Sequence, residues 1–148
     1  MTANYRSIDL VAIALANLMN TVMVVVFVLR SLTVGRLQIV GLVWTAMILV
    51  LAYVVTLNVR AKREWWTTVL PSLLLVFLIA EVALDYVARY EFRSTPLLGP
   101  YLFLYYVSIL GMIGYSFLTD KTYGFVTLAT YFLSQIAALY SYFKVAHG

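Results

Sequence analysis

Two carboxylates and a guanidinium are spaced four residues apart in a stretch that is otherwise uncharged and mostly apolar. Glu81, Asp85 and Arg89 are the only charged residues between positions 65 and 90. At about 100° per residue, this spacing places the three side chains on one face of a helix. Charge buried in a lipid bilayer is costly, so these residues are the first candidates for a functional site.

Glu81 is the member of this group with the largest number of possible roles. The low dielectric of the membrane and the negative charge of Asp85 one turn away both favour a neutral carboxylic acid at neutral pH. Such an acid could be a structural group that hydrogen-bonds to an amide. It could equally carry a proton, bind a cation or recognise a substrate.

Asp85 and Arg89 are predicted to form an ion pair at the membrane boundary. An acid four residues before an arginine is a common stabilising pair on a helix. Near the boundary, long side chains can also place their charged ends in water, which lowers the cost of burying the stem. The pair is therefore interpreted as structural, and a role in gating or ligand binding is the alternative.

The chain that carries these residues has the composition of a membrane protein. It has 148 residues, of which 64% are hydrophobic and 11% are charged, and its mean hydropathy is +0.97. A soluble globular domain has about 25% charged residues. We therefore expect residues 1–148 to form a single integral membrane domain with an all-α fold.

Several hydrophobic segments are long enough to cross a bilayer as helices, since about 20 apolar residues span its hydrocarbon core. The predicted polytopic bundle has five spans, at residues 8–29, 37–57, 67–88, 101–118 and 124–143. An odd number of spans places the two termini on opposite sides. The loop cations divide equally between the sides, and the dense basic run at 60–63 favours an N-terminus inside a prokaryotic cell membrane.

Polar residues recur near the midpoint of each span. Lipid offers no hydrogen-bond partners, so polar groups at one depth are expected to meet inside the bundle. The candidate ligand- or proton-binding residues of this mid-membrane layer are Glu81, Asn17, Asn20, Gln135, Tyr131 and Ser134, and Thr45 and Ser108 complete the layer. The amides are also suited to hydrogen bonds between helices, which contribute about 0.6 kcal/mol each.

The sequence lacks the residues that several cofactors need. It has no cysteine, and its only histidine is His147. This excludes disulfides and thiolate metal sites, and it gives no support for haem or zinc ligation within the membrane. No cofactor and no metal ion are expected. Nucleic acid is not an expected partner, because the basic residues lie in short loops beside hydrophobic runs.

These observations leave three classes of function. The favoured one is a non-enzymatic membrane transport or ligand-binding module with a mid-membrane polar site around Glu81. The alternative is an accessory or assembly subunit of a larger membrane complex. The third is an intramembrane enzyme acting on lipid or isoprenoid through Glu81 and Asp85, although no known catalytic motif is present. The expected partners are the lipid bilayer and either further copies of the chain or a larger membrane complex.

Overall fold

Five helices that are long and apolar enough to span a membrane make up the computed structural model, which confirms the predicted all-α bundle. The structure describes residues 5–32 and 38–147. The helices are α1 (Arg6–Ser31), α2 (Gln38–Arg60), α3 (Trp65–Glu81), α4 (Leu98–Thr119) and α5 (Lys121–His147). They coincide with the predicted spans and extend most of them by a few residues. The predicted start of the second span, residue 37, lies outside the described residues.

The third span changes its winding before it ends. Helix α3 continues directly into η1, a π-helix over Val82–Val87, and η2, a short 3-10 turn, follows over Phe92–Ser94. The π-helix is rare and is often found at functional sites, because its wider turn redirects side chains. Of the three residues that the sequence places on one face of an α-helix, Glu81 is the last residue of α3, Asp85 lies in η1 and Arg89 lies beyond η1.

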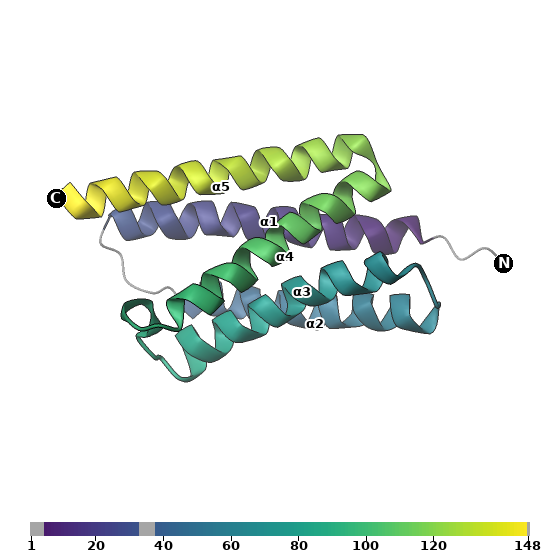
Figure 1. Cartoon of the computed structure of the whole chain (residues 1–148), viewed down its shortest axis with the longest axis horizontal. Coiled ribbons are helices and arrows are strands. Elements are labelled where there is room, and N and C mark those ends of the chain that lie inside the picture. The colour runs from purple at the N-terminus through teal and green to yellow at the C-terminus, as the bar shows by residue number, and fades with distance from the viewer. Residues whose placement is uncertain (1–4, 33–37, 148) are drawn as a thin grey trace.

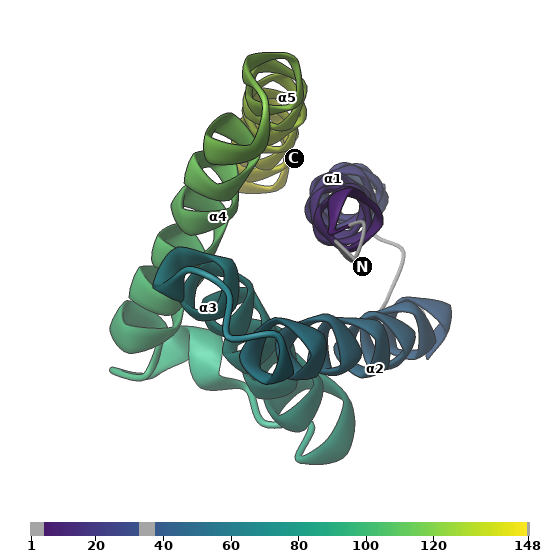
Figure 2. The same cartoon turned by 90° about the vertical axis from the view of Figure 1, so that its right-hand side faces the viewer.

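Four helices form a curved layer, and the fifth lies in its hollow. Seen end-on, α5, α4, α3 and α2 follow one another around an arc, and α1 lies on the concave side (Figure 2). Helix α1 packs along α5, whereas α3 packs against both α2 and α4. The two termini lie at opposite ends of the bundle, as an odd number of spans requires (Figure 1).

Helix α4 runs obliquely across the arc and connects its two halves. Its last turn lies beside the start of α5, from which only Asp120 separates it. Its first turn lies beside the end of the third span, away from α5 (Figure 1). Helices α4 and α5 therefore diverge from their tight turn toward the end of the bundle that carries η1 and η2.

Apolar side chains fill the space between α1 and the arc. The largest fully buried side chains include Trp44, Phe77 and Tyr115. Large apolar side chains such as Leu42 and Phe103 are exposed, as expected for surfaces that face lipid rather than water. The absence of a side chain at Gly41 permits a close contact, because a Cβ there would lie 2.6 Å from the ring of Tyr86 in η1.

Candidate functional site

The helix that carries Glu81 and Asp85 ends in an unusual backbone geometry. In η1, the backbone N–H of Ala88 donates to the carbonyl of Ala83 over 2.8 Å, the long spacing of a π-turn. Arg89 then adopts a φ of 49°, in the left-handed region that commonly terminates helices. The chain therefore turns away after Arg89 and returns through η2 (Phe92–Ser94).

This return brings Arg93, rather than Arg89, to Asp85. The Nη1 and Nη2 groups of Arg93 donate to the two carboxylate oxygens of Asp85 over 2.9 and 2.6 Å. The predicted partner Arg89 instead lies at a second cavity of about 560 Å³ between α2 and η1. The prediction assumed α-helical spacing through residue 89, and the π-winding and the left-handed residue remove that spacing.

Arg93 lies outside the membrane-spanning segments and stays charged. Burial lowers the pKa of its guanidinium, but the hydrogen bonds and the attraction of Asp85 outweigh burial and raise that pKa above its usual value. A bidentate arginine–carboxylate pair fixes both groups in one plane. The Asp85 side chain is buried and that of Arg93 is 33% exposed, so the pair is a fixed, partly buried element of the site.

Glu81 faces the interior, where Tyr101 of α4 binds it. The Tyr101 hydroxyl donates to the Glu81 carboxylate over 2.5 Å, and Glu81 is only 6% exposed. This is the one hydrogen bond to the Glu81 side chain among the described residues. Tyr101 is itself held between aromatic rings, with the centroid of Phe92 4.7 Å from its own. The second carboxylate oxygen is thus available to a molecule next to it.

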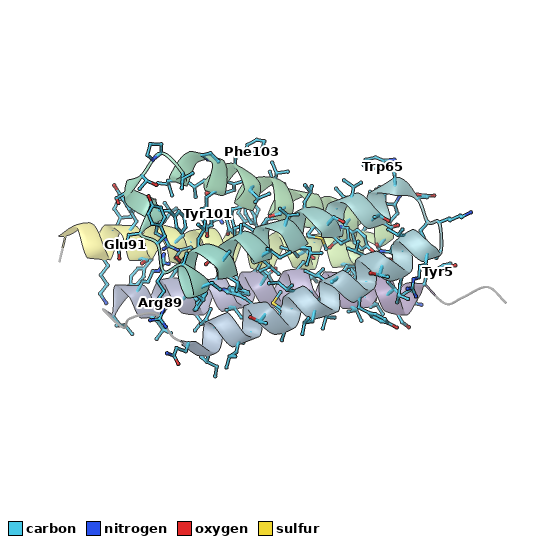
Figure 3. All side chains as sticks on the ribbon, turned by 90° about the horizontal axis from the view of Figure 1, so that it is seen from below. Tyr5, Trp65, Arg89, Glu91, Tyr101 and Phe103 are labelled. Carbon is cyan, nitrogen blue, oxygen red and sulfur yellow. The ribbon has the colours of Figure 1, made fainter. Side chains whose placement is uncertain are left out.

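A cavity of about 670 Å³ lies beside Glu81, between α1 and the diverging helices. We call this part of the molecule the cavity end. Figure 3 shows Arg89, Glu91 and Tyr101 gathered there, with Tyr5 and Trp65 at the opposite end. The charged residues that line the cavity are Arg30, Glu81, Asp85, Glu91 and Arg93, and aromatic side chains that line it are Phe27, Trp44, Tyr86, Tyr101, Tyr105 and Tyr106.

Arg30, in the last turn of α1, is the cation of this cavity that forms no ion pair with any residue that the structure describes. Its guanidinium lies 6.0 Å from the ring centroid of Phe27. Within the described residues it has neither an ion pair nor a side-chain hydrogen bond, whereas Arg93 has both. The site therefore combines an ion pair, a carboxyl bound by a phenol, and a guanidinium that has no partner in the described part of the chain.

Gln135 of α5 lines the same cavity as Glu81, from the opposite wall. Its amide nitrogen donates to the Tyr105 hydroxyl, and its amide oxygen accepts from the Tyr106 hydroxyl, each over 3.3 Å. Ser134 is buried and donates to the carbonyl of Tyr131, so its hydroxyl is used within α5. Of these sequence candidates, Gln135 is the one that shares the cavity with Glu81.

Asn17 and Asn20 belong to a different polar group, between α1 and α5. The amide nitrogen of Asn17 donates to Thr127, and that of Asn20 donates to Thr130, over 3.1 and 3.0 Å. The Thr130 hydroxyl also donates to the amide oxygen of Asn17. Both residues thus hold α1 against α5, which is the interhelical role that the sequence left open for them.

The predicted mid-membrane layer is therefore divided rather than continuous. Residue 76 is the midpoint of the span Trp65–Val87, so Glu81 lies five residues, or about 7 Å, from the midplane toward the cavity end. Thr45 is exposed at the second cavity, between α2 and η1, and its hydroxyl donates to the carbonyl of Gly41. Ser108 is fully buried, but its hydroxyl donates within α4, to Tyr105.

The end of the bundle opposite the cavity carries a second buried ion pair. Arg63, in the α2–α3 loop, donates to both carboxylate oxygens of Asp9 over 2.8 and 3.0 Å. The Tyr115 hydroxyl donates to the same carboxylate over 2.5 Å, and Asn58 accepts from Arg63 over 2.9 Å. The hydrogen bond to Asp9 raises the pKa of Arg63 against the effect of burial. We call these four residues the closed end.

Three residues of the cavity were not among the site candidates that the sequence suggested. Arg30 and Arg93 are loop cations by position, and such residues are usually topology signals. Tyr101 opens a span, where a tyrosine is usually an interfacial anchor. One signal was available: Met23, Phe27 and Arg30 have the i, i+4, i+7 spacing of a single helix face, which carries the arginine inward with its apolar neighbours.

Comparison of the chain with protein-family models, curated proteins and solved structures found no match. The function of this protein is therefore inferred from the chemistry of its own residues.

Proposed function

We propose that the chain is a non-enzymatic membrane protein that binds one small amphiphilic molecule in the cavity around Glu81. The volume of about 670 Å³ falls within the range of about 300–1,000 Å³ that is usual for small-molecule sites. Such sites are mostly apolar and contain a few convergent polar groups. The cavity has this composition, since apolar and aromatic side chains line it together with Arg30, Glu81 and Gln135.

The distribution of chemistry around the cavity carries the proposal. Helices α1 and α2 contribute an apolar wall that includes Met23, Phe27 and Trp44. The third span and η2 contribute the charged residues Glu81, Asp85 and Arg93. A molecule with an apolar body and a polar head would satisfy both walls, whereas neither water nor a bilayer chain alone would do so.

Binding is favoured over an open pore and over catalysis by two features of the site. The Asp9–Arg63 pair and its partners occupy the bundle opposite the cavity, so passage across the membrane would require these charges to separate. Both oxygens of Asp85 accept from Arg93, whereas Glu81 accepts from Tyr101. The two carboxylates are therefore not equivalent, and Asp85 is not free to act as an acid or a base. Transport and a subunit role in a larger membrane complex stay predictions.

Trp44 provides a direct test, because it lines the cavity while the other two tryptophans, Trp65 and Trp66, lie at the opposite end of the bundle. We would prepare the double variant Trp65→Phe/Trp66→Phe and titrate it in detergent with brominated single-chain amphiphiles. Bromine quenches indole fluorescence on contact. We expect saturable quenching of Trp44 by at least one of these probes, as for a site of limited capacity.

Two alanines of α5 supply a matched control. Ala138 lines the cavity, whereas Ala129 is exposed on the outer face of the same helix. In the Trp44-only background, Ala138→Phe should abolish saturable quenching because the larger ring fills the site, and Ala129→Phe should leave it unchanged. Absence of saturable quenching in the parent, or equal quenching in both phenylalanine variants, would overturn the proposal.

A further inference from the structure

Arg30 distinguishes the cavity from a generic apolar site. The other cation, Arg93, already donates to both oxygens of Asp85. Arg30 is exposed at the cavity, and its guanidinium donors have no acceptor among the described residues. Five N–H donors in a fixed plane match a carboxylate or a phosphate better than any other group.

Glu81 and Asp85, two of the three carboxylates that line the cavity, are buried, whereas Arg30 is exposed. Glu81 is 6% exposed and bound by Tyr101, and the sequence predicts its neutral form. Glu91 lies on the exposed loop before η2, where water screens its charge. The helix termini do not decide which charge the ligand carries. The C-terminus of α1 and the N-terminus of α4 both lie at this cavity, and their dipoles have opposite signs there. Arg30 is therefore the cation that a ligand can reach, next to carboxylates that are either buried or screened by water.

The apolar stripe of α1 leads directly to Arg30. Met23, Val26, Phe27 and Arg30 all line the cavity and share one helix face. Arg30 lies seven residues after Met23, which corresponds to about 10 Å at a 1.5 Å rise. An apolar chain laid along this face would meet the guanidinium at its polar end.

We infer that the ligand is an anionic single-chain amphiphile, whose carboxylate or phosphate head binds Arg30 and whose chain lies along Phe27 and Met23. This inference rests on the proposed function, since it names the ligand class of the same cavity. The carboxylate and phosphate share the oxyanion chemistry that Arg30 recognises. A cationic amphiphile, attracted by Glu81, is the outcome that would contradict it.

The test compares head groups with the chain held constant. The Trp44-only protein is titrated at alkaline pH with dibromostearate, with its uncharged glycerol ester and with a brominated alkyltrimethylammonium. A brominated lysophosphatidate is titrated as well, and its affinity relative to that of dibromostearate shows whether the site prefers a phosphate or a carboxylate head group. We expect at least one of the two anions to bind about tenfold or more tightly than the uncharged ester, as a charge-assisted hydrogen bond to arginine implies.

Arg30 variants assign this preference to the residue. Arg30→Gln should abolish the difference between the anion and the ester, and Arg30→Lys should restore part of it. Arg6→Gln removes the same charge from the other end of α1 and should leave the difference intact. A thermal melt of each variant checks that it is folded.

The possible results separate the two proposals. Saturable quenching with equal affinity for all heads, tighter binding of the ammonium probe, or an unchanged preference in Arg30→Gln would overturn the anionic ligand and leave the amphiphile site standing. No saturable quenching by any probe would overturn both.

Discussion

Each end of the bundle contains an aspartate that is bound by both arms of a loop arginine, but the surroundings of the two pairs differ. At the closed end, the carboxylate of Asp9 also accepts from Tyr115, and Arg63 also donates to Asn58. At the cavity end, the corresponding phenol, Tyr101, binds a different carboxyl, that of Glu81. One end gathers its polar groups into a single network, and the other distributes them around a space.

The difference begins in the backbone. After α2 the chain turns at Lys62, with a φ of 50°, and the very next residue is Arg63. After η1 the chain turns at Arg89, with a φ of 49°, and Arg93 follows only after η2. The short return holds Arg63 directly on the end of the bundle. The longer return places Arg93 at the wall of a cavity.

The comparison teaches that a buried ion pair is not by itself a sign of function. Such pairs often contribute little net stability, although removing one partner is costly. The closed end has every charge neutralised and contacted, which suits a structural plug. The cavity end has one guanidinium and two carboxyls beyond its pair, namely Arg30, the buried Glu81 and the exposed Glu91.

The largest effect is expected from breaking the closed end. Asp9→Asn leaves Arg63 without its counter-charge, and the two side chains are only 11% and 13% exposed. Loss of one partner of a buried pair costs about 3–5 kcal/mol. We expect the free energy of unfolding, measured by titration with a denaturing detergent, to fall by about that amount. Folded Asp9→Asn protein should still bind the amphiphile probe at Trp44.

The control for this prediction is Glu91→Gln, which removes one negative charge from an exposed loop position. We expect a change of about 0.5 kcal/mol or less, as is usual for surface substitutions. If Asp9→Asn were as mild as Glu91→Gln, the closed end would not be the structural plug described above. If Asp9→Asn abolished probe binding in the folded protein, the closed end and the cavity end would not be independent.

A smaller effect should come from the same glycine substitution made at each end. A Cβ at Gly124, in the first turn of α5, would lie 2.3 Å from both Cγ and Cδ1 of Phe117, and Cγ can move only if χ1 leaves its rotamer. A Cβ at Gly41 would contact Tyr86 farther out on its ring, at 2.6 and 2.8 Å, and Tyr86 borders the cavity. We expect Gly124→Ala to cost about 2–3 kcal/mol and Gly41→Ala about 1 kcal/mol.

Thermal or detergent unfolding of the two alanine variants measures this difference. Gly114→Ala is the control, because a Cβ at Gly114 meets nothing within 4 Å and alanine is the better helix former. It should leave stability unchanged or raise it slightly. Equal losses for Gly41→Ala and Gly124→Ala would mean that the cavity end is as tightly packed as the closed end.

The sequence was sufficient to predict the spans, because length and hydropathy are properties of each segment alone. The inward orientation of Glu81 followed for a similar reason, since lipid cannot satisfy a carboxyl. The helical pairing of Asn17 and Asn20 was also expected in kind. Their actual partners, Thr127 and Thr130, depend on α1 packing along α5, and no local pattern specifies which helix is the neighbour.

The arrangement at the cavity end depends on features that residue spacing does not encode. The pairing of Asp85 with Arg93 requires the π-turns of η1 and the left-handed Arg89. Arginine is not a residue that favours the left-handed region, so nothing at position 89 predicts that turn. The cavity itself arises from the oblique course of α4, which is a property of packing between helices rather than of one helix.

Removal of one phenol hydroxyl at each end should have the smallest effect on stability, and it should distinguish the two ends most clearly in ligand binding. Tyr101→Phe and Tyr115→Phe each remove one phenol hydroxyl that donates to a carboxylate over 2.5 Å. We expect each to lower the free energy of unfolding by about 1 kcal/mol. Asp9 keeps its two bonds from Arg63, whereas the Glu81 carboxyl loses its only donor among the described residues.

The two phenylalanine variants should therefore differ in ligand binding. Without the Tyr101 hydroxyl, the Glu81 carboxyl can turn into the cavity and compete with the ligand head for Arg30. The affinity of the Trp44-only protein for an anionic brominated probe should fall about threefold or more in Tyr101→Phe and stay unchanged in Tyr115→Phe. An equal loss in both variants would mean that the phenols affect binding only through stability, and the distinction between a structural end and a ligand-binding end would then fail.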